Sequence, residues 1–354
     1  MTSIVKPPVR HPSLRQNRLG LTLRDYEGVM STLCAGCGHD SVTAALVQAA
    51  WELELEPHRA AKMSGIGCSS KTTAYFMKQS HGFNSVHGRM PSVTTGAAAA
   101  NRGLTYIGIS GDGDSLSIGI GQMAHAIRRN VDMLYVIENN GVYGLTKGQF
   151  SASADVGSTS KRGEANEQAP IDPVLLALSI GATFVARSFS GDKKQLVPIL
   201  KAGLAHKGLA LVDVISPCVT FNDHEGSTKS YKFTREHEVE AVHADYVPLH
   251  TEITLPDAAS SADLVRVVQM HDGSSVRLRA TAADYDPTDR TSAYAHVRAC
   301  QSRGEIATGL LFVDEQSRDM HDLLKTPETP LIDLPFEQLC PGATALDALM
   351  ARYR

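Results

Sequence analysis

From about residue 40 onward, short apolar runs alternate with segments whose apolar residues recur every three to four positions. His39-Asp40 can begin a helix that stops before Pro57. Apolar runs predict buried strands at 105–109, 133–137, 183–185, 209–215 and 308–313. Helical spacing predicts helices near 114–129, 172–180, 192–206, 291–302 and from about 343. Strands separated by helices predict an α/β fold, a mostly parallel sheet with helices on both faces.

Three parts of the chain lack this pattern. Prolines at positions 7, 8 and 12 predict an extended N-terminal arm over residues 1–20, ahead of a main domain at 21–244. The polar stretch 146–170 is too long for a plain connection, so we expect a functional loop there. Beyond 245 the periodicity weakens and then returns. We therefore predict that residues 245–354 form a C-terminal extension that packs on the core or on a partner subunit.

Composition narrows the class of protein. The 354 residues carry 34 Lys+Arg and 38 Asp+Glu, a net charge of −4, so no basic field points to a nucleic-acid partner. No apolar run reaches bilayer length, and the N-terminus lacks the apolar core of a signal peptide. We expect no membrane anchor and a cytoplasmic location. Six cysteines are too sparse for a disulfide scaffold and are more often metal or redox ligands in a reducing compartment.

A Gly-Asp-Gly-Asp sequence at 111–114 lies where a predicted strand gives way to a helix. The next predicted strand ends in two asparagines, and Asn140 follows Asp112 by 28 residues. Because the carboxyl ends of neighbouring parallel strands line one crevice, these two side chains should face each other. A carboxylate, an amide oxygen and a main-chain carbonyl suit Mg²⁺, and the nearby glycines let the backbone approach a diphosphate. Taken alone, Gly-Asp-Gly can also be a tight strand-to-helix turn.

Four of the six cysteines lie in short motifs: Cys34, Cys37, Cys68 and Cys218. Four thiolates can hold either zinc or a cubane iron–sulfur cluster, and their spacing does not choose between the two. Free cysteines can also be small buried hydrophobic residues. For Cys300 and Cys340, which lie in the irregular C-terminal part, we expect that last role.

Together these signals closely resemble the β subunit of 2-oxoacid:ferredoxin oxidoreductases. In chain order, the resemblance is carried by Cys34-x-x-Cys37-Gly38-His39, Gly65-Ile66-Gly67-Cys68, His87-Gly88-Arg89, Gly111-Asp112-Gly113-Asp114, Asn139-Asn140, Leu145-Thr146-Lys147-Gly148-Gln149, Ser216-Pro217-Cys218 and Leu339-Cys340-Pro341-Gly342. The Leu-Thr-Lys-Gly-Gln segment is most similar to the 2-oxoglutarate type. The resemblance runs from about residue 30 to the C-terminus and is weakest between 250 and 290. Ala35 stands where these proteins usually have Pro, which relaxes the loop without removing a ligand.

The resemblance implies a thiamine-diphosphate-binding fold and a thiamine- and coenzyme A-dependent reaction. That reaction is the oxidative decarboxylation of 2-oxoglutarate to succinyl-CoA and CO₂, or its reverse, with one-electron transfer through a 4Fe-4S cluster to ferredoxin. Cys34, Cys37, Cys68 and Cys218 would hold the cluster. Asp112, Asn140 and the carbonyl of Val142 would hold Mg²⁺. The residues implied around thiamine diphosphate are Gly111, Asp112, Gly113, Asp114, Asn140, Val142, Gly144, Leu145 and Thr146.

The family resemblance also implies a partner. The carboxylate that activates the aminopyrimidine ring would come from an α subunit, so we expect a heterodimer that pairs again. Lys147 and Lys71 are candidates for holding the second carboxylate of the substrate, although a solvated lysine is an equally simple reading of Lys147. His87 and Arg89 are candidates for the cofactor crevice, but Arg89 can instead bind a carboxylate across an interface. For His39 we expect a helix cap.

Two other functions remain open on the sequence. A pyruvate-specific or broad 2-oxoacid enzyme of the same family would share every motif except the site for the second carboxylate. A zinc- or cluster-binding scaffold or electron-transfer protein would keep the cysteines and a vestigial thiamine site. Intact Asp112, Asn140 and their glycines argue against such decay.

Overall fold

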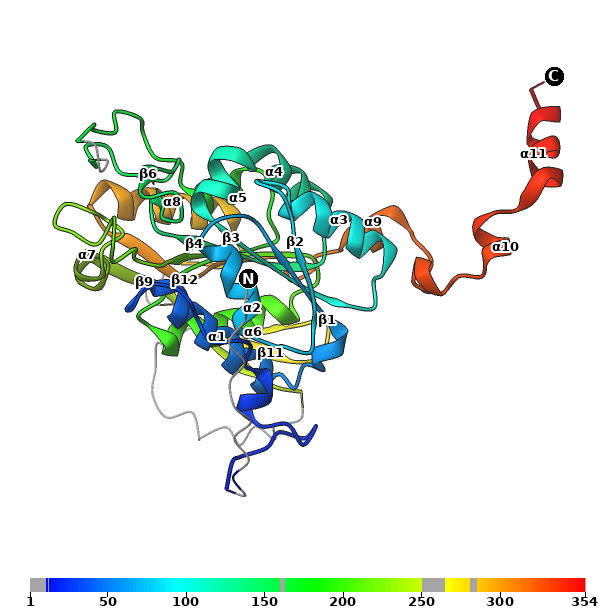
Figure 1. Cartoon of the computed structure of the whole chain (residues 1–354), viewed down its shortest axis with the longest axis horizontal. Coiled ribbons are helices and arrows are strands. Elements are labelled where there is room, and N and C mark those ends of the chain that lie inside the picture. The colour runs from blue at the N-terminus through cyan, green and yellow to red at the C-terminus, as the bar shows by residue number, and fades with distance from the viewer. Residues whose placement is uncertain (1–10, 12, 160–162, 250–264, 281–284, 354) are drawn as a thin grey trace.

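The computed structural model describes residues 11, 13–159, 163–249, 265–280 and 285–353. Within these residues a ten-stranded sheet crosses the molecule in the order β10-β11-β9-β12-β7-β8-β4-β3-β1-β2 (Figure 1). Helices cover both faces of this sheet, which confirms the predicted α/β architecture. No helix in the described part of the chain is both long and apolar enough to span a membrane.

Six neighbouring strands are parallel: β2 (His81–Asn84), β1 (Ala60–Ser64), β3 (Thr105–Gly111), β4 (Met133–Asn139), β8 (Leu209–Ile215) and β7 (Phe184–Phe189). The predicted strands in this half are confirmed. Every residue of β4 and β8 is buried, because helices cover both faces, and this is why their sequences are mostly apolar; the exceptions, Glu138, Asn139 and Asp213, are buried polar residues. Two strands were not predicted: β1, which carries Lys62, and β2, an edge strand with exposed side chains.

One face of the sheet carries α1 (Gly38–Glu52) and α6 (Lys193–Ala205), which pack on each other. The helices of the other face are α3 (Met90–Ala100), α4 (Ile120–Arg129), α5 (Pro173–Ser179) and α8 (Arg290–Ser302). The continuous helix predicted over 114–129 is wrong in its first part. A π-helical turn, η4 (Gly113–Ile118), comes first, and α4 starts after Gly119. Gly119 packs so closely on Gly88 that a β-carbon there would lie 2.9 Å from that neighbour.

The chain beyond β8 continues the same sheet. Its strands are β9 (Glu238–Val247), β10 (Val265–Gln269), β11 (Ser275–Ala280) and β12 (Ile306–Val313). β12 pairs antiparallel with β7 and parallel with β9. β9 crosses the boundary expected at 245, so the sheet joins the two predicted regions. Of these strands only β12 was expected, because the others carry charged residues in place of an apolar run.

After α9 (Met320–Leu324) the chain leaves the body, and its last helices are α10 (Phe336–Leu339) and α11 (Gly342–Ala351). All residues from 335 to 353, here called the C-terminal arm, are exposed, and they project away from the sheet (Figure 1). The predicted final helix is confirmed. This arm does not pack on the described core.

The remaining short elements are η1 (Leu23–Tyr26), η2 (Pro57–Arg59), η3 (Ser69–Lys71), α2 (Thr72–Tyr75), β5 (Val142–Tyr143), β6 (Gln149–Phe150), α7 (Tyr231–His237) and η5 (Leu331–Asp333). Of the predicted N-terminal arm, residues 1–10 and 12 lie outside the described residues. Residues 13–20 contain turns, and Asn17 anchors them to the body by donating hydrogen bonds to the Tyr26 hydroxyl and the Trp51 carbonyl.

Candidate functional site

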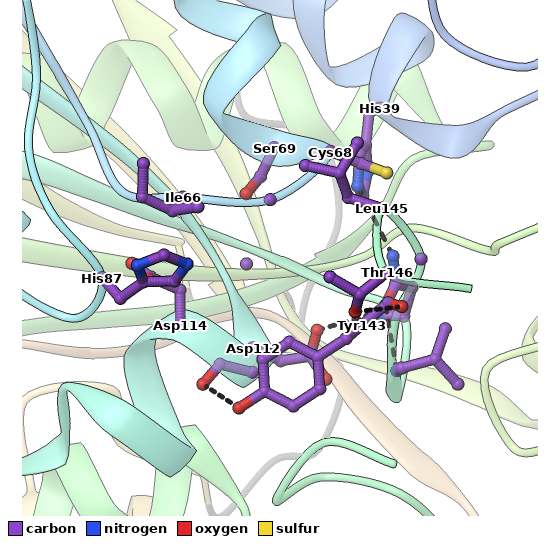
Figure 2. A pocket seen from close by; sticks show the side chains of 16 residues that line it. His39, Ile66, Cys68, Ser69, His87, Asp112, Asp114, Tyr143, Leu145 and Thr146 are labelled. Atoms are coloured by element: carbon purple, nitrogen blue, oxygen red, sulfur yellow. Dashed lines mark hydrogen bonds between the residues drawn. The ribbon is translucent and has the colours of Figure 1, made fainter. Parts of the chain in front are cut away.

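A cleft of about 460 Å³ lies at the carboxyl ends of β3 and β4 (Figure 2). It brings together all the residues that the resemblance assigns to thiamine diphosphate: Gly111, Asp112, Gly113, Asp114, Asn140, Val142, Gly144, Leu145 and Thr146. Cys68 and His87 also line it. The structure therefore joins the two motifs as the parallel strand order predicts.

Asp112 forms the buried floor of this cleft, with only 1% of its surface exposed. Its carboxylate accepts hydrogen bonds from the backbone N–H groups of Asn140 at 3.3 Å and Gly141 at 3.0 Å. It also accepts the hydroxyls of Ser151 and, at 2.6 Å, Ser153. Among the described residues, no Lys, Arg or His forms an ion pair with it. A buried carboxylate without a cationic side chain is suited to a metal ion.

Asn140 is held in a turn beside this carboxylate. Its Oδ1 accepts the backbone N–H of Val142 at 3.0 Å, and its carbonyl accepts the side-chain amide of Asn222 at 2.8 Å. The intervening Gly141 has φ +75°, and a β-carbon there would lie 2.6 Å from the Asn222 amide. Glycine is thus required by both the conformation and the space.

The two motifs also pack directly on each other. The Tyr143 hydroxyl donates to the carbonyl of Gly113 at 2.9 Å, and a β-carbon at Gly113 would lie 2.5 Å from the Tyr143 ring. Asp114, by contrast, binds protein groups on both oxygens. It accepts the N–H of Gly88 and the hydroxyl of Ser110, each at 2.8 Å. Asp114 therefore anchors the loop of the His-Gly-Arg motif to the start of η4.

His39 does not cap α1 as expected. Cys37 is the N-cap, and His39 lies inside the first turn, 1% exposed, with Nδ1 2.6 Å from the Ser216 hydroxyl. Burial lowers the pKa of His39 to about 4, so the ring is neutral at pH 7. Glu138 lies 3.7 Å away, fully buried, and accepts the Thr72 hydroxyl at 3.0 Å. Burial raises the pKa of Glu138 well above its usual value, which favours its neutral form.

The four motif cysteines converge beside the cleft. A β-carbon at Gly144 would lie 3.4 Å from the sulfur of Cys68 and 3.6 Å from that of Cys218. The loop of Cys34 and Cys37 packs on the Cys218 loop, because Thr220 lies 3.5 Å from the Cys34 sulfur and Gly38 donates to the Pro217 carbonyl. In the described residues, no group of three or more His, Cys, Asp or Glu side chains forms a site for a single metal ion.

Their surroundings disfavour the thiolate form of three of the four motif cysteines. Burial raises the pKa of Cys37 to about 12 and also raises the pKa values of Cys68 and Cys218, and nearby cysteines add to each shift. Lys71 counteracts the shift at Cys68. A metal centre bound here must displace these protons.

The predicted cationic residues lie around the cleft at different depths. His87 is exposed and lines the mouth, whereas Arg89 is the exposed N-cap residue of α3 and is not part of the lining. Lys71 is half-buried at the end of η3, on the side of Cys68. Lys147 is exposed at the tip of the β5–β6 hairpin, with φ +81°. The structure does not bring the two lysines together in the cleft.

Sequence reasoning missed several residues of this site. Ser69 lines the cleft, is 2% exposed, and its hydroxyl has no hydrogen-bond partner within the described chain. Ser151 and Ser153 bind Asp112. The only sequence signal for them was their position in the long polar stretch 146–170. Glu138 and Asn222 gave no signal at all. Cys340 is exposed, so the buried-thiol expectation is wrong there, whereas Cys300 is buried as expected.

Comparison with known proteins places these features in a family. Residues 65–214 match the model for the thiamine pyrophosphate enzyme C-terminal TPP-binding domain. The chain is 42% identical over 208 residues to a 2-oxoacid:ferredoxin oxidoreductase subunit beta of Saccharolobus solfataricus, covering 58% of this chain and 68% of that protein. It is 32% identical over 236 residues to the 2-oxoglutarate synthase subunit KorB of Methanocaldococcus jannaschii, covering 65% and 83%.

A third relative, the 2-oxoglutarate oxidoreductase subunit KorB of Mycobacterium tuberculosis, is 40% identical over 191 residues, which cover 54% of this chain and 51% of the relative. Among solved structures, the chain is similar to a 2-oxoglutarate:ferredoxin oxidoreductase from Magnetococcus marinus, solved with 2-oxoglutarate, coenzyme A and succinyl-CoA bound. The TM-score is 0.70 at 29% identity, and the match covers 88% of this chain and 91% of the other.

Proposed function

The chain belongs to the family of 2-oxoacid:ferredoxin oxidoreductase β subunits, and from this we propose that it is the β subunit of a 2-oxoglutarate:ferredoxin oxidoreductase. The reaction is the thiamine- and coenzyme A-dependent conversion of 2-oxoglutarate to succinyl-CoA and CO₂, or its reverse, with electrons exchanged with ferredoxin. The observation that carries the proposal is the convergence of four cysteines on the edge of the cleft formed by the two diphosphate motifs.

The cleft fits thiamine diphosphate and Mg²⁺. Asp112 offers a buried carboxylate that lacks a cationic partner among the described residues, and Asn140 and Val142 offer neutral oxygens beside it. The unpartnered Ser69 hydroxyl is a donor for a diphosphate oxygen, because leaving a buried hydroxyl unpaired costs about 1–3 kcal/mol. A carboxylate with neutral oxygen donors is the set that Mg²⁺ uses beside phosphates.

We assign an iron–sulfur cluster to the cysteines in preference to a single zinc ion. The relatives are named ferredoxin oxidoreductases, and a reaction that passes electrons to ferredoxin needs a one-electron carrier. Zinc has no redox chemistry. Cys34, Cys37, Cys68 and Cys218 are the ligands we propose, and Lys71 stabilises the thiolate of Cys68.

Each residue of the cleft has a task in this proposal. When bound, thiamine diphosphate supplies the group that takes up the electrons of the cleaved carbon–carbon bond, and the cluster supplies a one-electron acceptor. Asp112, Asn140 and the Val142 carbonyl hold Mg²⁺, and Ser69 orients the diphosphate. Tyr143 holds the two motifs together through its hydrogen bond to Gly113. His39 is neutral at pH 7, and burial favours the neutral form of Glu138 behind it.

The choice of 2-oxoglutarate rests on two supports. Relatives named KorB are 2-oxoglutarate enzymes, and the similar solved structure holds 2-oxoglutarate. Lys147 and Lys71 supply positive charge near the cleft for a second carboxylate, with His87 and Arg89 at or near its mouth. Relatives named only for 2-oxoacids favour the alternative, a pyruvate-accepting or broad 2-oxoacid enzyme.

An α subunit and ferredoxin complete the proposed assembly. Among the described residues, the cleft is lined by two carboxylates, Asp112 and Asp114, and both are already bound by protein groups, so neither serves an aminopyrimidine ring. The α subunit supplies that group in the proposed heterodimer. The C-terminal arm packs on it, because a β subunit has this partner and the arm exposes apolar residues such as Leu346, 58% exposed. Six free cysteines fit a reducing compartment, so we place the assembly in the cytoplasm.

An assay of the anaerobically purified complex of this chain with its α subunit tests the function. We expect four irons per β chain and reduction of ferredoxin that requires both 2-oxoglutarate and coenzyme A. Faster turnover with pyruvate would favour the broader enzyme. Zinc in place of iron, with no turnover of any 2-oxoacid, would overturn the proposal in favour of a scaffold.

A further inference from the structure

His39 lies between the cysteine loops and the metal-binding motif. It is two residues beyond Cys37, and its Nδ1 is 2.6 Å from the hydroxyl of Ser216, which is two residues before Cys218. On its other side, Nε2 is 3.5 Å from the side-chain amide nitrogen of Asn140. The ring is 1% exposed, so water does not replace these contacts.

These contacts determine which way the Asn140 amide points. Its Oδ1 accepts the N–H of Val142 at 3.0 Å, so Nδ2 is the atom that faces His39. An amide N–H facing a ring nitrogen requires a lone pair there, which places the ring hydrogen on Nδ1, toward Ser216. Rotating the amide by 180° would set two donors against each other at Val142 and two acceptors at His39.

The main chain of Asn140 is held from the same direction. Asn222 donates to its carbonyl at 2.8 Å, and the backbone N–H of Asn222 bonds to the carbonyl of Cys218 at 2.9 Å. The loop of Cys37 therefore reaches the side-chain amide of Asn140 through His39, and the loop of Cys218 reaches the Asn140 carbonyl through Asn222.

We propose that His39 is a positioning residue that turns Oδ1 of Asn140 toward Mg²⁺ and so makes the cysteine loops part of the cofactor site. The inference rests on the proposed function. A partner that orients a metal ligand typically changes metal affinity by about 10- to 100-fold when it is removed. The structure thus couples the order of the cluster loops to the affinity for thiamine diphosphate and Mg²⁺.

The test is titration calorimetry of thiamine diphosphate with Mg²⁺ into the anaerobic complex of this chain with its α subunit. His39→Leu removes both hydrogen bonds at similar volume, and we expect the dissociation constant to rise at least about 10-fold with the iron content unchanged. His39→Gln keeps an acceptor for Asn140 and a donor for Ser216, so it should stay within about 3-fold of the parent.

His206→Leu is the matched control, because His206 is also buried but bonds to Thr183 at the amino ends of β7 and β8, opposite to the strand ends that form the cleft. Its affinity for the cofactor should match the parent. Equal affinity in His39→Leu and the parent would overturn the inference. Equal losses in His39→Leu and His39→Gln, or loss of iron in both, would also overturn it by showing a purely structural role. Absence of cofactor binding in the parent complex would instead reject the proposed function.

Discussion

Gly144 lies against Cys68, so that a β-carbon at this glycine would be 3.4 Å from the cysteine sulfur. Gly144 follows β5 in the second diphosphate motif, and Cys68 belongs to the loop after β1. Cys68 itself also lines the cleft, so the cleft and the motif cysteines are in direct contact. Electrons leaving a cofactor in the cleft would reach a cluster at these cysteines without crossing the rest of the protein.

The cluster assignment predicts different outcomes for two cysteine variants. Cys218→Ala should strip or convert the cluster and abolish ferredoxin reduction, because it removes one of four ligands. Cys300→Ala should keep both the cluster and ferredoxin reduction, because Cys300 is buried in α8, where its sulfur contacts His296 and Arg303. Iron analysis and the visible absorption spectrum of the two purified variants decide. Equal iron content in both would reject the ligand set.

The metal assignment predicts that Asp112→Ala loses thiamine diphosphate but keeps iron. Without this carboxylate, the diphosphate charge in a buried cleft is poorly neutralised. We expect at least a 100-fold weaker cofactor affinity, about 2.7 kcal/mol, in calorimetric titration. Asp112→Asn keeps the shape and should lose nearly as much. Full cofactor retention in both variants would show that the cofactor site lies elsewhere.

The parts of the fold that could be predicted are those where one physical effect dominates. β4 is buried on both faces, and its first five residues, 133–137, are therefore an unbroken apolar run. β1 does not, because Lys62 stands in its middle and finds partners only in three dimensions, the carbonyls of Phe76 and Met77. β2 lies at the edge of the sheet with all its side chains exposed, so its sequence has no apolar pattern.

In the site, too, contacts between neighbouring strands could be predicted, whereas contacts made by distant loops could not. The spacing of Asp112 and Asn140 is short enough for strand order to bring them together, and the structure does so. Ser153 reaches Asp112 through a loop 41 residues later along the chain, which no local pattern encodes. His39 carried a local signal, the position next to a helix start, and this signal favoured the wrong role because the long-range contact with Ser216 decides its orientation.

The C-terminal arm predicts a truncation effect. A chain ending at Leu334 should keep its fold, because residues 335–353 are all exposed, yet bind its α subunit at least about 10-fold more weakly. A helix as short as α11 is marginal in water unless another surface covers Leu346, Leu349 and Met350. Circular dichroism checks the fold and gel filtration with the α subunit checks the affinity. Unchanged binding, or loss of a homodimer instead, would show that the α subunit does not cover the arm.

Lys62 predicts a pH dependence of stability. Burial lowers its pKa to about 8, from 10.5 in the unfolded chain. Between these values the unfolded state binds more protons, so the free energy of unfolding should rise with pH by up to about 1.4 kcal/mol per unit. Denaturant unfolding of the parent and of Lys62→Met isolates this group. From pH 8 to 10.5 the free energy of unfolding of the parent should rise relative to that of Lys62→Met. A constant difference between the two free energies would reject the lowered pKa of Lys62.

The substrate assignment predicts a selective effect of Lys147. 2-Oxoglutarate differs from pyruvate by a second carboxylate, and burying that charge requires a cation close to it. Lys147 stands at the tip of the hairpin that carries the cleft residues Leu145 and Thr146, and its side chain is exposed. Lys147→Met keeps the length of the side chain and removes the charge.

We expect this change to lower kcat/KM for 2-oxoglutarate at least about tenfold, a loss of about 1.4 kcal/mol of charge-assisted binding, while pyruvate turnover falls much less. Lys71→Met tests the second candidate, and Lys232→Met, an exposed position on α7, is the matched control. A uniform loss for all substrates would assign Lys147 to the structure of the hairpin, where it holds φ +81°. No loss in Lys147→Met with a selective loss in Lys71→Met would move the carboxylate site to the side of Cys68.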